Sequence, residues 1–184
     1  MATIEAHTRT GIARYMSDGI GESQLSVCLS EIPVGHLDRL TWRGSYGIGC
    51  RKEVIDASGG QMIIYLPKGT AAAGRFQRVV NPRHARPSPT RQPYRPRPSV
   101  VAFTQFVENP GEYGDTRYEF AWEREWRVPH GLRFSENDVA ILLAAEEDHN
   151  WIRQNAWVRL SPSAFRGPVL DPRWNIERVP ARTG

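Results

Sequence analysis

Lysine is nearly absent from this sequence of 184 residues, because Lys52 and Lys68 are the only two among 24 basic side chains. Arginine therefore carries the positive charge, and its planar guanidinium suits contacts with phosphates and stacking on bases. With 20 acidic residues, the net charge is +4 at pH 7. A basic chain of this kind is compatible with a nucleotide or nucleic-acid partner, and charge alone does not distinguish the two.

Cysteines and long apolar runs are also scarce. Cys28 and Cys50 are the only cysteines, and neither they nor the five scattered histidines have the spacing of metal ligands. No apolar run approaches the roughly 20 residues of a membrane-spanning helix. The first residues, MATIEAHTRTG, contain no apolar signal core. We therefore expect a reduced, cytoplasmic protein with no membrane partner and no metal.

The pattern of apolar residues predicts an α+β fold in a single domain over residues 1–184. Short apolar runs bounded by glycine and proline indicate strands, and apolar residues spaced by three or four indicate helices. The predicted helices cover residues 8–20, 34–44 and 146–156, the last with an acidic first turn. The predicted strands cover residues 25–32, 45–55, 62–66 and 138–145, and residues 160–184 are expected to form an irregular C-terminal wrap.

Residues 81–99, NPRHARPSPTRQPYRPRPS, contain six of the 14 prolines and five arginines. Proline removes backbone donors and favours extended backbone, so we expect a long inserted loop with no regular element. Its composition is typical of a solvated connection. It is also compatible with an arm that contacts phosphates through Arg91, Arg95 and Arg97, with Tyr94 stacking on a base.

The stretch YEFAWEREWRVP, residues 118–129, combines three glutamates and two arginines with two tryptophans. As a strand, it places Glu123, Glu125 and Arg127 on one face. As a helix, it forms an apolar stripe of Tyr118 and the two tryptophans opposite salt-bridged charges. A third possibility is a mixture, with a helix or loop up to Trp122 and a strand that begins near Glu125. Periodicity alone leaves these three open, and a packed, salt-bridged element accounts for the pattern without any catalytic role.

Three segments occur in a characteristic order: VCLSEIP, then YGIGCRKEVI followed by MIIYLPKG, and finally EREWRVP before a hydrophobic strand. In this order they resemble the AbiGi-like abortive-infection proteins of bacteria and related families of phage-defence loci. The resemblance covers roughly residues 10–145, apart from the proline-rich insertion. It implies a role in phage defence, either as a toxin or anti-phage effector or as the antitoxin of such a pair.

These families are in turn similar to DarT-type ADP-ribosyltransferases, whose mixed-sheet fold binds NAD as a co-substrate. The similarity implies that the late Glu-x-Glu motif is formed by Glu123 and Glu125. Glu125 would stabilise the positive charge that develops on the ribose, and Glu123 would orient or deprotonate the acceptor. Arg51 or Lys52 would hold the pyrophosphate.

Four further residues are candidates for binding NAD by the same resemblance. Tyr46 would stack on nicotinamide (Trp126 is an alternative), and Ser30 would donate to the nicotinamide amide or to a ribose. His7 and Thr8 would replace the N-terminal His-x-Thr-like motif, although they are adjacent here, without a spacer. Gly47 and Gly49 would let the backbone approach the ligand, and a bulged strand is the alternative explanation for them.

Two other classes of function stay open. The first is a non-catalytic module that binds nucleic acid or a cognate toxin or antitoxin protein. The second is a metal-dependent nuclease that uses Glu119, Glu123 and Glu125, although no aspartate or lysine near them completes such a site. The acceptor of an ADP-ribosyl group, a nucleic acid or a protein, is not defined by the sequence.

Overall fold

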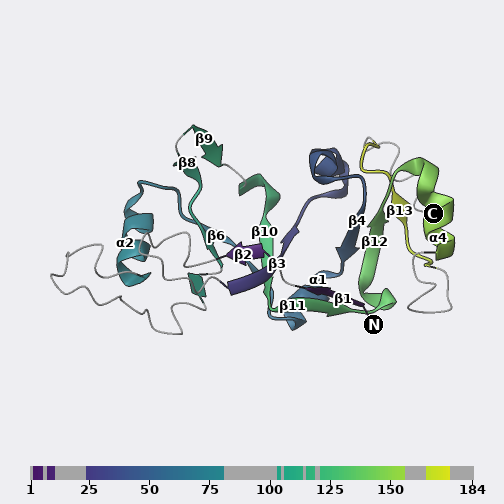
Figure 1. Cartoon of the computed structure of the whole chain (residues 1–184), viewed down its shortest axis with the longest axis horizontal. Helices are drawn as coiled ribbons and strands as arrows, with labels where there is room; N and C mark the ends of the chain where they lie inside the picture. Colours follow the sequence, from purple (N-terminus) through teal and green to yellow (C-terminus); the bar gives the residue numbers. More distant parts are fainter. Residues whose placement is uncertain are drawn as a thin grey trace. The chain divides into compact units, whose positions relative to one another are not determined.

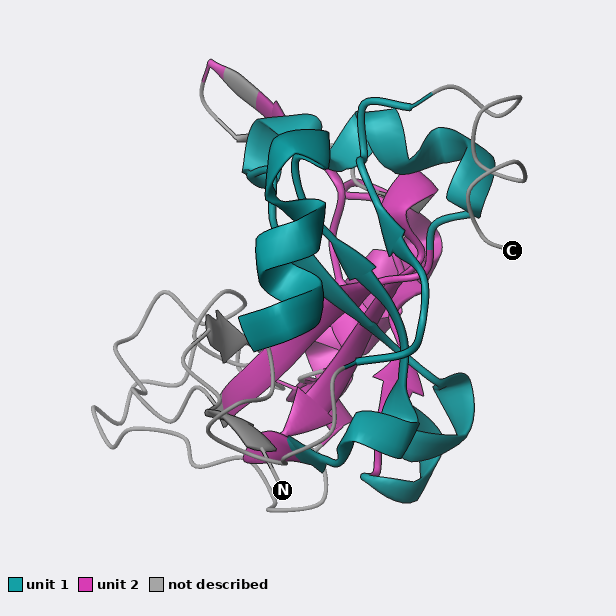
Figure 2. Cartoon of the chain, turned by 90° about the vertical axis from the view of Figure 1, so that its right-hand side faces the viewer, with its two compact units in different colours: residues 1–4, 32–58, 133–184 teal, residues 5–31, 59–132 magenta. Residues whose placement is uncertain are grey.

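The computed structural model describes residues 2–5, 8–10, 24–80, 103–104, 106–113, 115–118, 121–155 and 165–174. The chain divides into two compact units, each built from segments far apart in sequence (Figure 2). Unit 1 comprises residues 1–4, 32–58 and 133–184, and unit 2 comprises residues 5–31 and 59–132. Within the described residues, every helix is too short or too polar to span a membrane.

The main sheet of unit 2 has four antiparallel strands (Figure 1). In spatial order they are β2 (Thr8–Thr10), β3 (Gln24–Ser30), β10 (Glu125–Pro129) and β5 (Gln61–Met62). Val27 of β3 faces Val128 of β10, and both side chains are buried. Burial of this apolar pair fixes the register, because a shift of one residue would move the apolar side chains of one strand from the core face of the sheet to the solvent face.

The strand predicted over residues 62–66 divides at Ile63 into β5 and β6 (Ile64–Tyr65). The N–H of Ile63 donates to the carbonyl of Glu125 in β10 (2.9 Å), whereas the next N–H donates to Phe106 (2.8 Å). The chain therefore changes partner within one residue, and β6 pairs in parallel with β7 (Val107–Glu108). Further described elements of unit 2 include α2 (Ala71–Val80), β8 (Gly111–Tyr113), β9 (Thr116–Tyr118) and the 3-10 turn η4 (Ala121–Glu123).

Unit 1 contains a sheet of three strands. The central strand β12 (Val139–Leu143) pairs antiparallel with β4 (Gly47–Cys50) and in parallel with β13 (Val169–Leu170). A further strand pair joins β1 (Ala2–Glu5) to β11 (Gly131–Phe134), and the division between the two units falls within both of these strands. The apolar core beside the three-stranded sheet consists of Leu37, Leu40, Ile141, Leu143, Leu170 and Trp174.

Two predicted helices of unit 1 are confirmed. The first is η2 (Val34–Arg43), a 3-10 helix that buries Leu37 and packs Leu40 against the core. The second consists of the acidic turn η6 (Glu146–Asp148) followed directly by α4 (His149–Asn155). Two further short elements of the described part of this unit are α1 (Lys52–Ala57) and η5 (Glu136–Asp138). Helices mixed with small, mainly antiparallel sheets confirm the α+β class.

Three expectations need correction. Residues 8–10 form strand β2 rather than the start of a helix, and residues 11–20 lie outside the described part. The strand expected over 45–55 ends at Cys50, because Arg51 caps helix α1 and its N–H donates to Asp138 (2.8 Å). The stretch 160–184 contains β13, whose Leu170 carbonyl accepts the N–H of Ala144 (3.0 Å). The proline- and arginine-rich loop, 81–99, lies outside the described residues.

Candidate functional site

The Glu-x-Glu motif forms a sharp turn from a 3-10 helix into a strand. Turn η4 ends at Glu123, strand β10 begins at Glu125, and Arg124 between them has a φ of 45°. A positive φ is uncommon for a residue with a side chain and indicates a locally strained backbone. The mixed interpretation of this segment, with a strand beginning near Glu125, is therefore confirmed.

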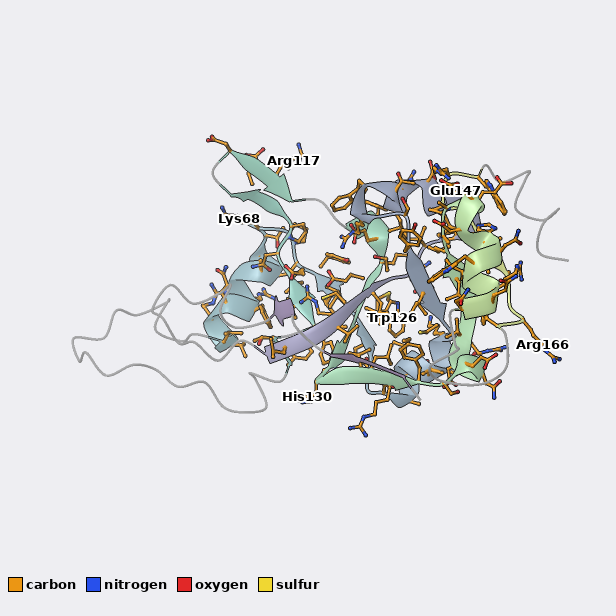
Figure 3. All side chains as sticks on the ribbon, turned by 45° about the vertical axis from the view of Figure 1, so that its right-hand side comes forward. Lys68, Arg117, Trp126, His130, Glu147 and Arg166 are labelled. Carbon is orange, nitrogen blue, oxygen red and sulfur yellow. The ribbon has the colours of Figure 1, made fainter. Side chains whose placement is uncertain are left out.

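Glu31 stabilises the turn from the opposite side. Its N–H donates to the carbonyl of Glu123 (3.1 Å), and its carboxylate pairs with the guanidinium of Arg124 (3.2 Å). The other carboxylate oxygen accepts the indole N–H of Trp126 (2.8 Å), which Figure 3 labels on β10. Trp126 therefore helps to anchor the turn, which accounts for one of the two tryptophans around the glutamates.

Arg127 holds the carboxylate of Glu125 by two bonds from the same guanidinium. Nε donates to Oε1 at 2.8 Å and Nη2 to Oε2 at 3.3 Å. Nη2 also donates to Glu108 of β7. The arginine side chain is only 2% exposed, whereas Glu125 is 16% and Glu108 14% exposed. Burial by itself would lower the pKa of Arg127, but the bonds and charges of both carboxylates outweigh it and raise that pKa above its usual range.

Tyr65 adds a hydroxyl group to the same cluster. Its oxygen accepts the backbone N–H of Glu125 (3.2 Å). Burial raises the pKa of this hydroxyl, and the charges of Glu125 and Glu123 raise it further. The hydrogen bond from the Glu125 backbone and the charge of Arg127 oppose this rise without cancelling it. The hydroxyl therefore stays protonated near neutral pH.

Ser30 and Glu123 are in contact beside this cluster. The Ser30 hydroxyl donates to Glu123 Oε2 at 3.4 Å, and Ser30 lies opposite Glu125 in the β3–β10 register. The Glu123 residue is only 2% exposed. The structure thus brings together three of the predicted site residues in unit 2, and Glu123 is the most buried of them.

The predicted residues for pyrophosphate and nicotinamide lie in unit 1. Arg51 donates from Nε to the carbonyl of Asn137 (3.0 Å), and Lys52 is the exposed first residue of α1. Tyr46 has an exposed ring, and its hydroxyl donates to Asp148 (2.6 Å), which is the main reason that the pKa of Tyr46 is raised. Because Glu125 belongs to unit 2 and these residues belong to unit 1, their expected meeting stays a prediction.

Gly47 and Gly49 serve the packing of unit 1. They lie opposite Leu143 and Ile141 across the β4–β12 pair. A Cβ at position 49 would collide with the Ile141 side chain, and one at position 47 would lie 3.2 Å from Leu143 Cδ1. The space above both glycines is therefore filled by core side chains rather than left for a ligand. The irregularity expected for this strand lies in its partner, where the register shifts between Val139 and Ile141.

The other predicted contacts are described only in part. Thr8 pairs with Ser26 in the β2–β3 register, while His7 lies outside the described residues, as do Arg91, Arg95 and Arg97. Among the described residues, no three histidine, cysteine or acidic side chains are grouped so as to hold a metal ion. Glu119, a member of the nuclease hypothesis, lies outside them.

Three members of the cluster were not candidates from sequence: Tyr65, Glu108 and Arg127. Strand alternation placed Arg127 on the same face as Glu125. It therefore indicated that the two side chains are neighbours, but not that Arg127 holds the Glu125 carboxylate by two hydrogen bonds. Glu108 and Tyr65 lie 19 and 60 residues from their partners along the chain, so no local pattern reveals them.

No family model matches the chain, and no match was found among curated proteins or solved structures.

Proposed function

We propose that the protein is an ADP-ribosyltransferase-like enzyme that transfers ADP-ribose from NAD to a macromolecule, as a toxin or anti-phage effector. The observation that carries the proposal is the turn at Arg124, which holds two carboxylates in different environments. Glu125 is clamped by Arg127, whereas Glu123 bonds to Ser30. Paired carboxylates with distinct partners are able to divide the labour of a reaction.

The chemistry assigns a role to each carboxylate. Breaking the bond between nicotinamide and ribose develops positive charge on the ribose, which a neighbouring carboxylate stabilises. Glu125 fits this role, because it is held in place by Arg127 and is still 16% exposed. Glu123 would orient or deprotonate the acceptor. The Ser30 hydroxyl would exchange its 3.4 Å hydrogen bond to Glu123 for one to NAD. Arg51 or Lys52 would hold the pyrophosphate, and Tyr46 would stack on nicotinamide.

The test is transfer of label from NAD. The full-length chain is incubated with NAD labelled in its adenylate half and with a cell extract, and label is measured in the protein and nucleic-acid fractions. The Glu125→Gln variant is expected to lose roughly 100-fold or more of the transfer. The matched control is Glu53→Gln, an identical change on the exposed face of α1, which should label as the wild type does.

The buried ion pair of Glu125 also favours a second candidate. A carboxylate held by a buried arginine can be purely structural, and the chain would then be a non-catalytic module that binds nucleic acid or a cognate toxin or antitoxin. That candidate predicts no labelling by the wild type. It also predicts nucleic-acid binding that weakens steeply with salt and with Arg91, Arg95 and Arg97 changed to alanine.

A further inference from the structure

We propose that Arg127 and Glu108 form a positioning pair, which fixes the Glu125 carboxylate for the two neighbouring hydroxyls of a ribose. The proposal rests on the proposed function. It adds two residues from distant strands to the site and assigns them an indirect role, because neither is placed against the substrate. It also specifies the feature of NAD that Glu125 recognises, namely its vicinal diol.

The first step is the geometry of the clamp. Arg127 approaches Glu125 side-on, with Nε at 2.8 Å from Oε1 and Nη2 at 3.3 Å from Oε2. A carboxylate has about four lone-pair positions, two on each oxygen. Side-on pairing uses one position on each oxygen and leaves one on each. Two acceptors at fixed spacing suit two vicinal hydroxyl donors, as on a ribose.

The second step is the difference in exposure along the clamp. Arg127 is 2% exposed and Glu125 is 16% exposed, so the arginine lies behind the carboxylate and the carboxylate forms the accessible edge. A guanidinium is always charged and planar, and its fork of donors therefore fixes the plane of its partner. Lysine in the same place would keep the charge but would lose the plane, because an ammonium is a point charge without a fork.

The third step is the role of Glu108. It accepts from the same Nη2 that reaches Glu125 Oε2, so it restrains rotation of the guanidinium from the opposite side. Glu108 is held on β7, which pairs in parallel with β6, the strand that carries Tyr65. The Tyr65 hydroxyl in turn accepts the N–H of Glu125 (3.2 Å). The main chain and the side chain of Glu125 are thus both fixed by this parallel strand pair.

The experiment compares Arg127→Lys with Arg133→Lys, the same substitution at an exposed position of β11. For Arg127→Lys, kcat for NAD turnover should fall roughly tenfold or more, while KM for NAD changes less than about threefold, because binding is kept and orientation is lost. Circular dichroism and a thermal melt establish the folded fraction, and kcat is expressed per folded molecule. Glu108→Gln should lower kcat by a smaller factor, because its amide oxygen still accepts from Nη2.

A double-substitution cycle separates positioning from general stability. In a Glu125→Asp background the shorter side chain no longer reaches the Nε and Nη2 donors of Arg127. Arg127→Lys should therefore lower kcat by less than about threefold in that background. An equal loss in both backgrounds would show that Arg127 does not act through Glu125. If Arg127→Lys leaves kcat per folded molecule unchanged in the wild-type background, Arg127 is purely structural, and either result overturns this inference alone. A wild type without NAD turnover would instead overturn the proposed function and this inference with it.

Discussion

Each unit contains an arginine paired with a carboxylate two residues before it, and the two pairs are buried in opposite order. In unit 2, Arg127 is buried (2% exposed) and Glu125 lies toward the surface (16%). In unit 1, Asp171 is buried (2%) and Arg173 is 56% exposed. The same spacing in sequence thus gives two different ion pairs. In one the arginine is buried, and in the other the carboxylate is buried.

The carboxylate of Asp171 accepts hydrogen bonds from several groups of unit 1. It accepts the N–H of Glu146 (2.9 Å) and the N–H of Arg173 (2.8 Å), besides the Arg173 guanidinium. Arg173 also reaches Glu147, which Figure 3 labels near α4. Asp171 therefore ties the segment after β13 to the start of η6, whereas Glu125 accepts from one buried arginine and keeps an exposed edge. This contrast is why we assign a site to unit 2 and a structural tie to unit 1.

The largest effect is expected from removing the buried arginine. Arg127→Ala leaves Glu125 and Glu108 as uncompensated neighbours, which should lower the free energy of unfolding by about 3–5 kcal/mol. Arg173→Ala removes an exposed cation, and Asp171 keeps its two backbone donors, so the loss should be about 1 kcal/mol or less. Urea denaturation at pH 7, followed by circular dichroism, measures both. Equal losses would show that the order of burial does not distinguish the two pairs.

Acid should affect the Asp171 pair next. Hydrogen bonds from the Arg173 side chain, and to a smaller extent from the backbone N–H groups of Arg173 and Glu146, lower the pKa of Asp171 to about 2, below the value of about 3.9 in an unfolded chain. The folded state therefore favours the ionised form, and this stabilisation is complete above pH 4 and is lost as the pH falls toward 2. Its size is about 2 kcal/mol.

Asp171→Asn provides the control for this acid effect. It removes the titrating group, so the variant should be less stable at pH 7 and should lose less stability than the wild type between pH 4 and pH 2. Urea midpoints at a series of pH values in this window measure the difference. If wild type and variant lose stability in parallel, the acid sensitivity belongs to other carboxylates.

The sequence predicted the local features of both regions and not their burial. The strand that begins at Glu125 was one of three interpretations that periodicity left open, whereas the acidic turn before α4 followed from three adjacent acidic residues at 146–148. Strand β13 was missed because it lies among prolines and pairs with β12, about 27 residues earlier in the register. The buried member of each pair is bonded to a residue distant in sequence, Arg127 to Glu108 and Asp171 to Glu146, and no local pattern reveals these contacts.

The smallest effects on stability are expected from replacing one glycine in each unit by alanine. Gly49→Ala in β4 places a Cβ against Ile141 in the core of unit 1, and overpacking there should cost on the order of 1 kcal/mol. Gly74→Ala in α2 places a Cβ 3.9 Å from Arg78 Nη1, an ordinary contact. It should stabilise unit 2 by about 0.5–1 kcal/mol, because alanine has the higher helix propensity and loses less backbone entropy.

Thermal and urea unfolding of the two alanine variants should therefore shift in opposite directions from the wild type. A stabilised Gly49→Ala variant would mean that Ile141 moves aside without cost, and the space above β4 would then be open to a ligand after all. A destabilised variant assigns that space to the core of unit 1. In that case the glycines in YGIGC have a packing role, and Arg51 and Lys52 are the only residues of that segment left as candidates for binding phosphate.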